Sequence, residues 1–134
     1  MFYPIGDVEG FSERLRARLI KVGVKTTRHL LDRGAQAAGR RTLAAATGES
    51  EAEIDRAVEI ADLMRVNGCG AGYATLLHAA GVTSVTALAG ADADALHAAL
   101  TAAKPMARHV RRLPTLAQVR ACIADARAVQ PIVT

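Results

Sequence analysis

The amino-acid sequence predicts an all-α fold, and three observations lead to this prediction. Apolar residues recur at intervals of three and four along much of the chain, as on one face of a helix, and no segment keeps the alternating pattern of a strand. The composition is 51% hydrophobic but only 3% aromatic, and abundant alanine with four prolines in 134 residues favours helix. Capping residues also stand where helices would begin. A chain of this length fits a single compact domain, 1–134.

Two similar stretches divide the chain into repeats. Val8-Glu9-Gly10-Phe11-Ser12 matches Val66-Asn67-Gly68-Cys69-Gly70 at an offset of 58 residues, and the match continues without a gap over about 27 residues. We therefore expect a duplication, with repeat one at about 8–65, repeat two at about 66–112 and a C-terminal helix at about 115–129.

The first repeat predicts four helices. The first runs from residue 12 or 13 to residue 22, with Leu15, Leu19 and Val22 on its apolar face, and ends at Gly23 in the position of a left-handed C-cap. A short second helix follows to residue 31, with Thr26 as its cap. After a small-residue link at 34–39, the third helix spans 40–46.

The fourth helix, 51–64, is the best defined, because Ser50 and Glu53 form a capping box ahead of it. Its predicted faces are a buried stripe and an acidic row that we expect to be solvated or to receive a basic helix. The stripe is Ile54, Val58 and Ala61, and the row is Asp55, Glu59 and Asp62.

The second repeat predicts helices at 71–80, at 85–89 after the cap Ser84, and from the cap Asp92 to residue 103. A further helix is expected from Pro105, at a first-turn position, to Arg112. Leu113-Pro114 ends it, and a capping box at residues 115–118 opens the last helix, which runs to about residue 129.

The glycine-containing stretch at 61–70, followed by the apolar run at 73–82, resembles the helix-hairpin-helix superfamily. Together with the half-motif at Gly10, the segment 38–48 and the element 111–115, the chain resembles a bacterial tandem helix-hairpin-helix family of unknown function over nearly its whole length. The resemblance implies contact with DNA that does not depend on sequence, through backbone amides of the hairpin and nearby basic side chains.

The two repeats carry the parts of such a site unequally. Glycines allow close approach to a phosphate, the following helix offers free N–H groups, and Lys or Arg adds charge. Repeat one has a basic row, Arg14, Arg18 and Lys21, but Ser12 stands in place of the second glycine. Repeat two keeps both glycines of its turn but has no Lys or Arg between residues 66 and 103.

A second basic row, Lys104, Arg108 and Arg111, is predicted near the C-terminus at intervals of four and three, beside an apolar stripe of Met106, Val110 and Leu113. Arg112, Arg120 and Arg127 add to its charge. The alternatives are that these rows are solvated helix faces, or that one of them pairs with the acidic row. The candidate DNA-binding residues are Gly10, Arg14, Arg18, Lys21, Gly68, Gly70, Lys104, Arg108, Arg111 and Arg112.

Other chemistry is not indicated by the sequence. The four histidines are scattered away from metal-ligand spacing, so we expect no metal site, no cofactor and no catalytic residues. Cys69 and Cys122 lie 53 residues apart and are expected to be reduced thiols in a cytoplasmic protein with no signal or membrane segment. The net charge of +4 fits an anionic partner such as duplex DNA. The alternative is a protein-interaction module or homo-oligomer that uses the uncharged region 66–103.

Overall fold

The computed structural model describes residues 2–107 and 109–134, and for residues 69–71 it describes the helix but not the side chains. Within this part the all-α prediction is confirmed. Eight α-helices and two short 3-10 helices are present, without a strand, and the one isolated bridge joins Pro4 to Thr26. The chain divides into two compact units, residues 2–61 with 132–134 and residues 62–131. None of the described helices is long and apolar enough to cross a membrane.

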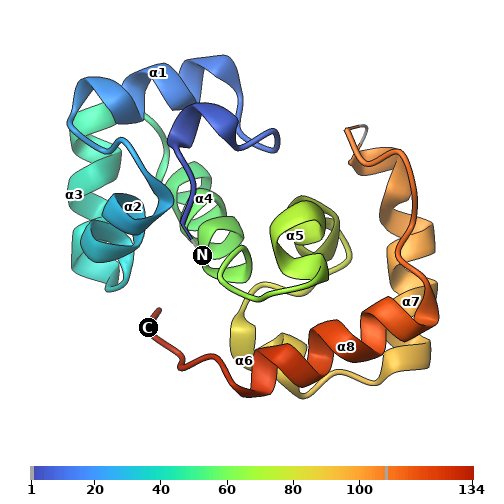
Figure 1. Cartoon of the computed structure of the whole chain (residues 1–134). Coiled ribbons are helices and arrows are strands. Elements are labelled where there is room, and N and C mark those ends of the chain that lie inside the picture. The colour runs from blue at the N-terminus through green and yellow to red at the C-terminus, as the bar shows by residue number, and fades with distance from the viewer. Residues whose placement is uncertain (1, 108) are drawn as a thin grey trace. The chain divides into compact units, whose positions relative to one another are not determined.

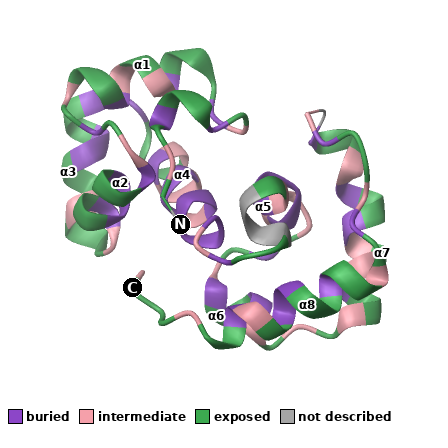
Figure 2. Cartoon of the chain, viewed as in Figure 1, coloured by how far each residue is buried: buried purple, intermediate pink, exposed green. Residues whose placement is uncertain are grey.

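The first unit is built from the N-terminal helices, which carry both buried and exposed positions (Figure 2). Its core includes Phe11, Leu15, Leu19, Leu30 and Ile54, each at most 2% exposed. Leu15, Leu19 and the stripe of the fourth helix are buried as predicted. The elements are η1 (Ile5–Asp7), α1 (Glu13–Lys21), α2 (Thr27–Gly34), α3 (Ala37–Thr47) and α4 (Glu51–Leu63) (Figure 1).

The end of the chain belongs to this first unit. The Thr134 N–H donates to Ala35 O at 2.8 Å, and Arg40 Nη2 donates to Thr134 O at 2.7 Å. Arg40 also donates to Gly34 O and Ala35 O, at 2.9 and 3.0 Å. The link between α2 and α3 is therefore held to the last residues by backbone and guanidinium hydrogen bonds.

In the second unit, α8 packs against α6 and α7, and α5 contacts α7 and α8 (Figure 1). Thr115 and Gln118 form the predicted capping box of α8. Cys122 on α8 is disulfide-bonded, so the prediction of a reduced thiol is wrong for this residue. The elements are α5 (Cys69–Ala79), α6 (Val85–Ala89), α7 (Ala93–Ala103), η2 (Lys104–Met106) and α8 (Leu116–Arg127).

The links from α1 to α2 and from α5 to α6 share hydrogen bonds at an offset of 58 residues. The Val24 N–H donates to Leu19 O at 2.9 Å, and the Val82 N–H donates to Leu77 O at 3.0 Å. Val24 and Val82 are both buried. The two helix ends are therefore closed in the same way.

The residues around these bonds correspond as well. Gly23 and Gly81 have φ values of 88° and 97°, which favour glycine, and Gly23 confirms the predicted left-handed end. Thr26 and Ser84 then cap α2 and α6, each accepting from the N–H three residues on, at 3.2 and 3.0 Å. One set of local interactions thus builds a helix, a reversal and a second helix in both places.

The helix predicted from Pro105 to Arg112 is wrong. Among the described residues of this stretch, only the 3-10 helix Lys104–Met106 forms, and Ala107 has φ −125° and ψ 71°, outside the helical region. Pro105 lacks the N–H needed to continue α7, and Pro114 disfavours helix just before itself. The stretch between them is too short for an independent helix. Buried Ala107 and Val110 anchor it instead, whereas Met106 is 71% exposed.

The third helix begins three residues earlier than predicted, because Gly39 lies within α3 and does not end a loop. A Cβ on Gly39 would lie 1.8 Å from Arg33 O, so only glycine allows this approach of α3 to the end of α2. The acidic row is not simply solvated either: Asp55 pairs with Arg40 at 3.0 Å, and buried Asp62 pairs with Arg65.

Candidate nucleic-acid interface

The first turn, residues 8–12, is anchored by apolar side chains that are buried in the core. Val8 and Phe11 are each 2% exposed, and the Phe11 N–H donates to Val8 O at 3.1 Å to close the turn. Ser12 then begins α1 by accepting from the Leu15 N–H at 3.1 Å. Gly10 lies in the turn, partly exposed, directly ahead of the positive end of α1.

Two arginines outside the predicted set of DNA-binding residues hold this turn. Arg16 Nε donates to Val8 O at 3.1 Å, and Arg56 Nη1 donates to Gly10 O at 3.3 Å. Each guanidinium has five N–H donors, and among the described residues each uses one of them in a hydrogen bond to a carbonyl of the turn. The remaining donors and both charges lie at the turn, where a phosphate would approach the start of α1. The sequence could have indicated Arg16, because it lies one helical turn after the cap Ser12. No sequence pattern indicated Arg56.

The two arginines of the predicted basic row of α1 form ion pairs within the protein. Arg14 donates to both oxygens of Glu49, at 3.1 and 3.2 Å, and Arg18 Nη1 donates to Glu49 Oε1 at 3.0 Å. The Glu49 side chain is 3% exposed, against 65% for Arg14 and 41% for Arg18. The two arginines therefore neutralise a buried carboxylate in the loop between α3 and α4. Lys21 is exposed, so the row contributes one unpaired cation among the described residues.

The second turn, residues 66–70, has a glycine backbone that would allow a phosphate to approach closely, but it has no Lys or Arg to attract the phosphate. Gly68 has φ 74° and ψ −115°, a combination that favours glycine. A Cβ at Gly68 would meet Asp125 Oδ2 at 3.3 Å, so a carboxylate of α8 lies beside the turn. This negative charge opposes a phosphate at Gly68. The predicted site residue Gly70 lies among residues 69–71, outside the side-chain description.

The C-terminal basic residues do not share a helix face. Lys104 is half-buried in η2, whereas Arg111 and Arg112 are exposed in the irregular segment before α8. Arg108 lies outside the described residues. The predicted row at intervals of four and three is therefore wrong, because the helix that would create it does not form. Arg111 and Arg112 remain as exposed positive charges in the second unit.

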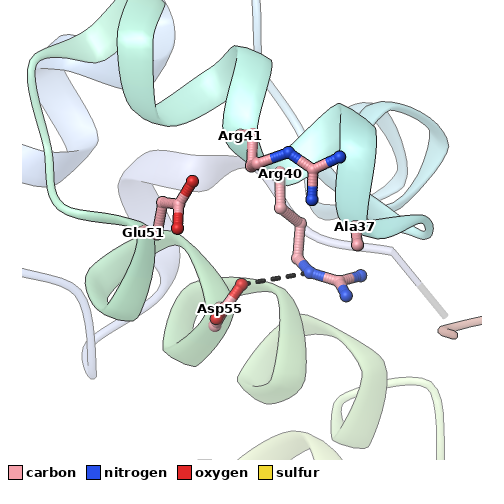
Figure 3. A pocket seen from close by; sticks show the side chains of 5 residues that line it. All are labelled: Ala37, Arg40, Arg41, Glu51 and Asp55. Atoms are coloured by element: carbon pink, nitrogen blue, oxygen red, sulfur yellow. Dashed lines mark hydrogen bonds and ion pairs between the residues drawn. The ribbon is translucent and has the colours of Figure 1, made fainter.

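A small polar pocket of about 110 Å³ between α3 and α4 has balanced charge (Figure 3). Arg40 and Asp55 form its ion pair, and Arg41 and Glu51 stand at its edge, so two positive side chains face two negative ones. Arg40 is also held by carbonyl oxygens, which fixes it as a structural group. Across the described residues, no three side chains of the metal-ligating types gather into a site.

The fold and these sites define a small all-helical protein with an arginine-supported turn at the start of a helix. The chain belongs to the family described as a domain of unknown function (DUF4332), whose model matches residues 9–129. No curated protein and no solved structure matches the chain.

Proposed function

We propose that this protein is a non-catalytic, cytoplasmic tandem helix-hairpin-helix protein that binds the backbone of duplex DNA without reading its sequence. The repeat arrangement is supported by the shared hydrogen bonds and caps at an offset of 58 residues. In this proposal the segments 8–34 and 66–89 are the two hairpin regions.

The observation that carries the proposal is the pair of arginines on the first turn. Arg16 and Arg56 bring two positive charges to the turn carbonyls at 3.1 and 3.3 Å, ahead of the free N–H groups of α1. Phosphate contacts of this kind position a duplex and carry no sequence information. Gly10 and Lys21 complete the proposed contact surface, and Arg111 and Arg112 add longer-range attraction.

A titration of fluorescent random-sequence duplex at two salt concentrations tests the proposal. We expect saturable binding whose log affinity falls by about 0.9 per phosphate contact per unit of log salt. Arg16→Ala/Arg56→Ala should lower the affinity by about tenfold or more, because two charge-assisted contacts are lost. It should also reduce the salt slope by about two.

The matched control is Lys25→Ala/Arg41→Ala, which removes the same charge from two exposed positions of the same unit. It should change affinity by less than about threefold, as expected for charges away from the contact surface. Equal losses in the two double variants, with the far-ultraviolet spectrum unchanged in both, would reject the first turn as the contact site.

The alternative is a protein-interaction module or homo-oligomer that uses the region 66–103. It is favoured by the absence of Lys and Arg from that region of the sequence and by Asp125 beside Gly68, which opposes phosphate binding there. It predicts no duplex binding near physiological salt, together with a defined oligomer in a solution mass measurement.

A further inference from the structure

A second hollow of the surface lies in the 62–131 unit, between the start of α7 and one face of α8. It has a volume of about 330 Å³ and is lined by Ala91, Asp92, Ala93, Arg120, Ile123 and Arg127. This volume is at the lower end of the range for small-molecule sites, about 300–1,000 Å³. We propose that this hollow binds a small phosphomonoester, with the phosphate between Arg120 and Arg127.

The two arginines lie on one face of α8. A spacing of seven residues is two helical turns, about 10 Å along the axis, so two long side chains can converge on one phosphate between them. Arg127 Nε donates to Ala89 O, the last residue of α6, at 3.2 Å, which orients the guanidinium and leaves its other donors for a ligand. Among the described residues neither Arg120 nor Arg127 forms an ion pair.

The start of α7 supplies backbone donors on the opposite side. Asp92 caps the helix by accepting from the Ala95 N–H at 2.9 Å, which leaves the Ala93 and Asp94 N–H groups without an acceptor inside the helix. Ala91 and Ala93 are small and leave this backbone accessible. The lining therefore combines two arginine charges with one carboxylate, an excess of one positive charge that favours an anion.

The remaining lining residues are apolar. Ile123 is 4% exposed and lies between the two arginines in sequence, and the alanines continue the hydrocarbon surface. Because the hollow has both arginine and apolar lining residues, a ligand with a phosphate and a short carbon-rich part fits it better than a bare anion. Arginine forks bind phosphate through two parallel hydrogen bonds, which distinguishes this site from general surface attraction.

Nuclear magnetic resonance titration of the full chain with inorganic phosphate and with phenyl phosphate tests the proposal. Saturable shifts should centre on the amides of residues 91–94 and 120–127, with phenyl phosphate binding more tightly because its ring contacts the apolar wall. Arg120→Ala/Arg127→Ala should weaken binding by about tenfold or more. The equally charged control Lys25→Ala/Arg41→Ala, in the other unit, should leave it within about twofold.

A gain-of-affinity variant makes the test independent of folding losses. Asp92→Asn keeps a good capping residue and removes the one negative side chain among the described residues that line the hollow, so phosphate should bind several times more tightly. An unchanged or weaker affinity of this variant would overturn the proposal. So would shifts that do not saturate, that centre elsewhere, or that persist in the double-arginine variant.

Duplex DNA forms the last arm of the same titration. Shifts at residues 91–94 and 120–127 with duplex, but with neither phosphate compound, would overturn the small-ligand proposal and assign the hollow to a nucleic-acid backbone. Because this readout is the binding of small phosphates in the second unit, it can fail while the first turn still binds duplex, or succeed when it does not.

Discussion

In residues 8–34, which we propose as the first hairpin region, an arginine-supported turn leads into α1, and a left-handed glycine and a threonine cap lead on to α2. In the second, residues 66–89, a left-handed glycine and a serine cap at equivalent positions link α5 to α6, but an aspartate of α8 lies beside the turn at Gly68. The links from α1 to α2 and from α5 to α6 use the same backbone interactions, while the charged side chains near the two turns differ. Two segments can therefore share local backbone geometry and still carry different chemistry.

The largest effect is expected from Arg14→Ala/Arg18→Ala, which has no counterpart in the second region. It leaves the Glu49 carboxylate, 3% exposed, without either ion-pair partner. The free energy of unfolding should fall by about 2–3 kcal/mol, less than for a fully buried pair because both arginines remain partly exposed to solvent. Urea denaturation measures the change. Adding Glu49→Gln should restore most of the loss, and wild-type stability in the double variant would contradict a structural role.

Gly68→Ala tests the backbone of the second turn. The conformation at φ 74° and ψ −115° is strained for alanine, and the new Cβ would lie 3.3 Å from Asp125 Oδ2. We expect a stability loss of about 1–3 kcal/mol. Gly72→Ala in α5 is the control, because nothing lies within 4 Å of its Cβ and alanine favours helix by about 1 kcal/mol. Thermal unfolding of the pair should move in opposite directions.

Glu49→Gln should increase the affinity for duplex by about three- to tenfold, because Arg14 and Arg18 are released from a carboxylate in the loop between α3 and α4. The comparison is Glu51→Gln, an exposed acid two residues away whose loss changes the net charge equally. Fluorescence titration of both proteins measures the difference. The same gain in both would mean that only net charge matters.

Asp125→Asn should have the smallest effect, a gain of about twofold in duplex affinity, because it removes the charge beside Gly68 without supplying a cation. Titration under the same conditions gives the value. A gain larger than that of Glu49→Gln would reverse the assignment and make the second turn the principal contact.

Local interactions explain what could be predicted from the sequence. The caps Thr26, Ser84, Asp92 and Thr115 each bond within three residues, so a short stretch determines where a helix begins. The left-handed end at Gly23 is equally local. The helix predicted from Pro105 did not form. Proline favours the first turn of a helix, but Pro105 also interrupts the preceding helix α7, and Pro114 disfavours helix just before itself.

The candidate site depended on interactions that no short stretch contains. Glu49 bonds with Arg14 and Arg18 across 35 and 31 residues, and Arg56 reaches Gly10 across 46. Spacing placed Arg14 and Arg18 correctly on one face of α1, but it gave no information about the carboxylate opposite that face. The basic row was therefore recognised and its partner was not.

The return of residues 132–134 makes the first unit discontinuous in sequence. In topological terms, residues 62–131 are an insertion between Ala61, near the end of α4, and the last three residues, which act as a staple. Arg40 holds this staple by its bond to Thr134 O at 2.7 Å. Cutting the chain after Ala61 therefore does not give two natural fragments. The N-terminal fragment would lack the staple, which a short peptide would have to supply in trans.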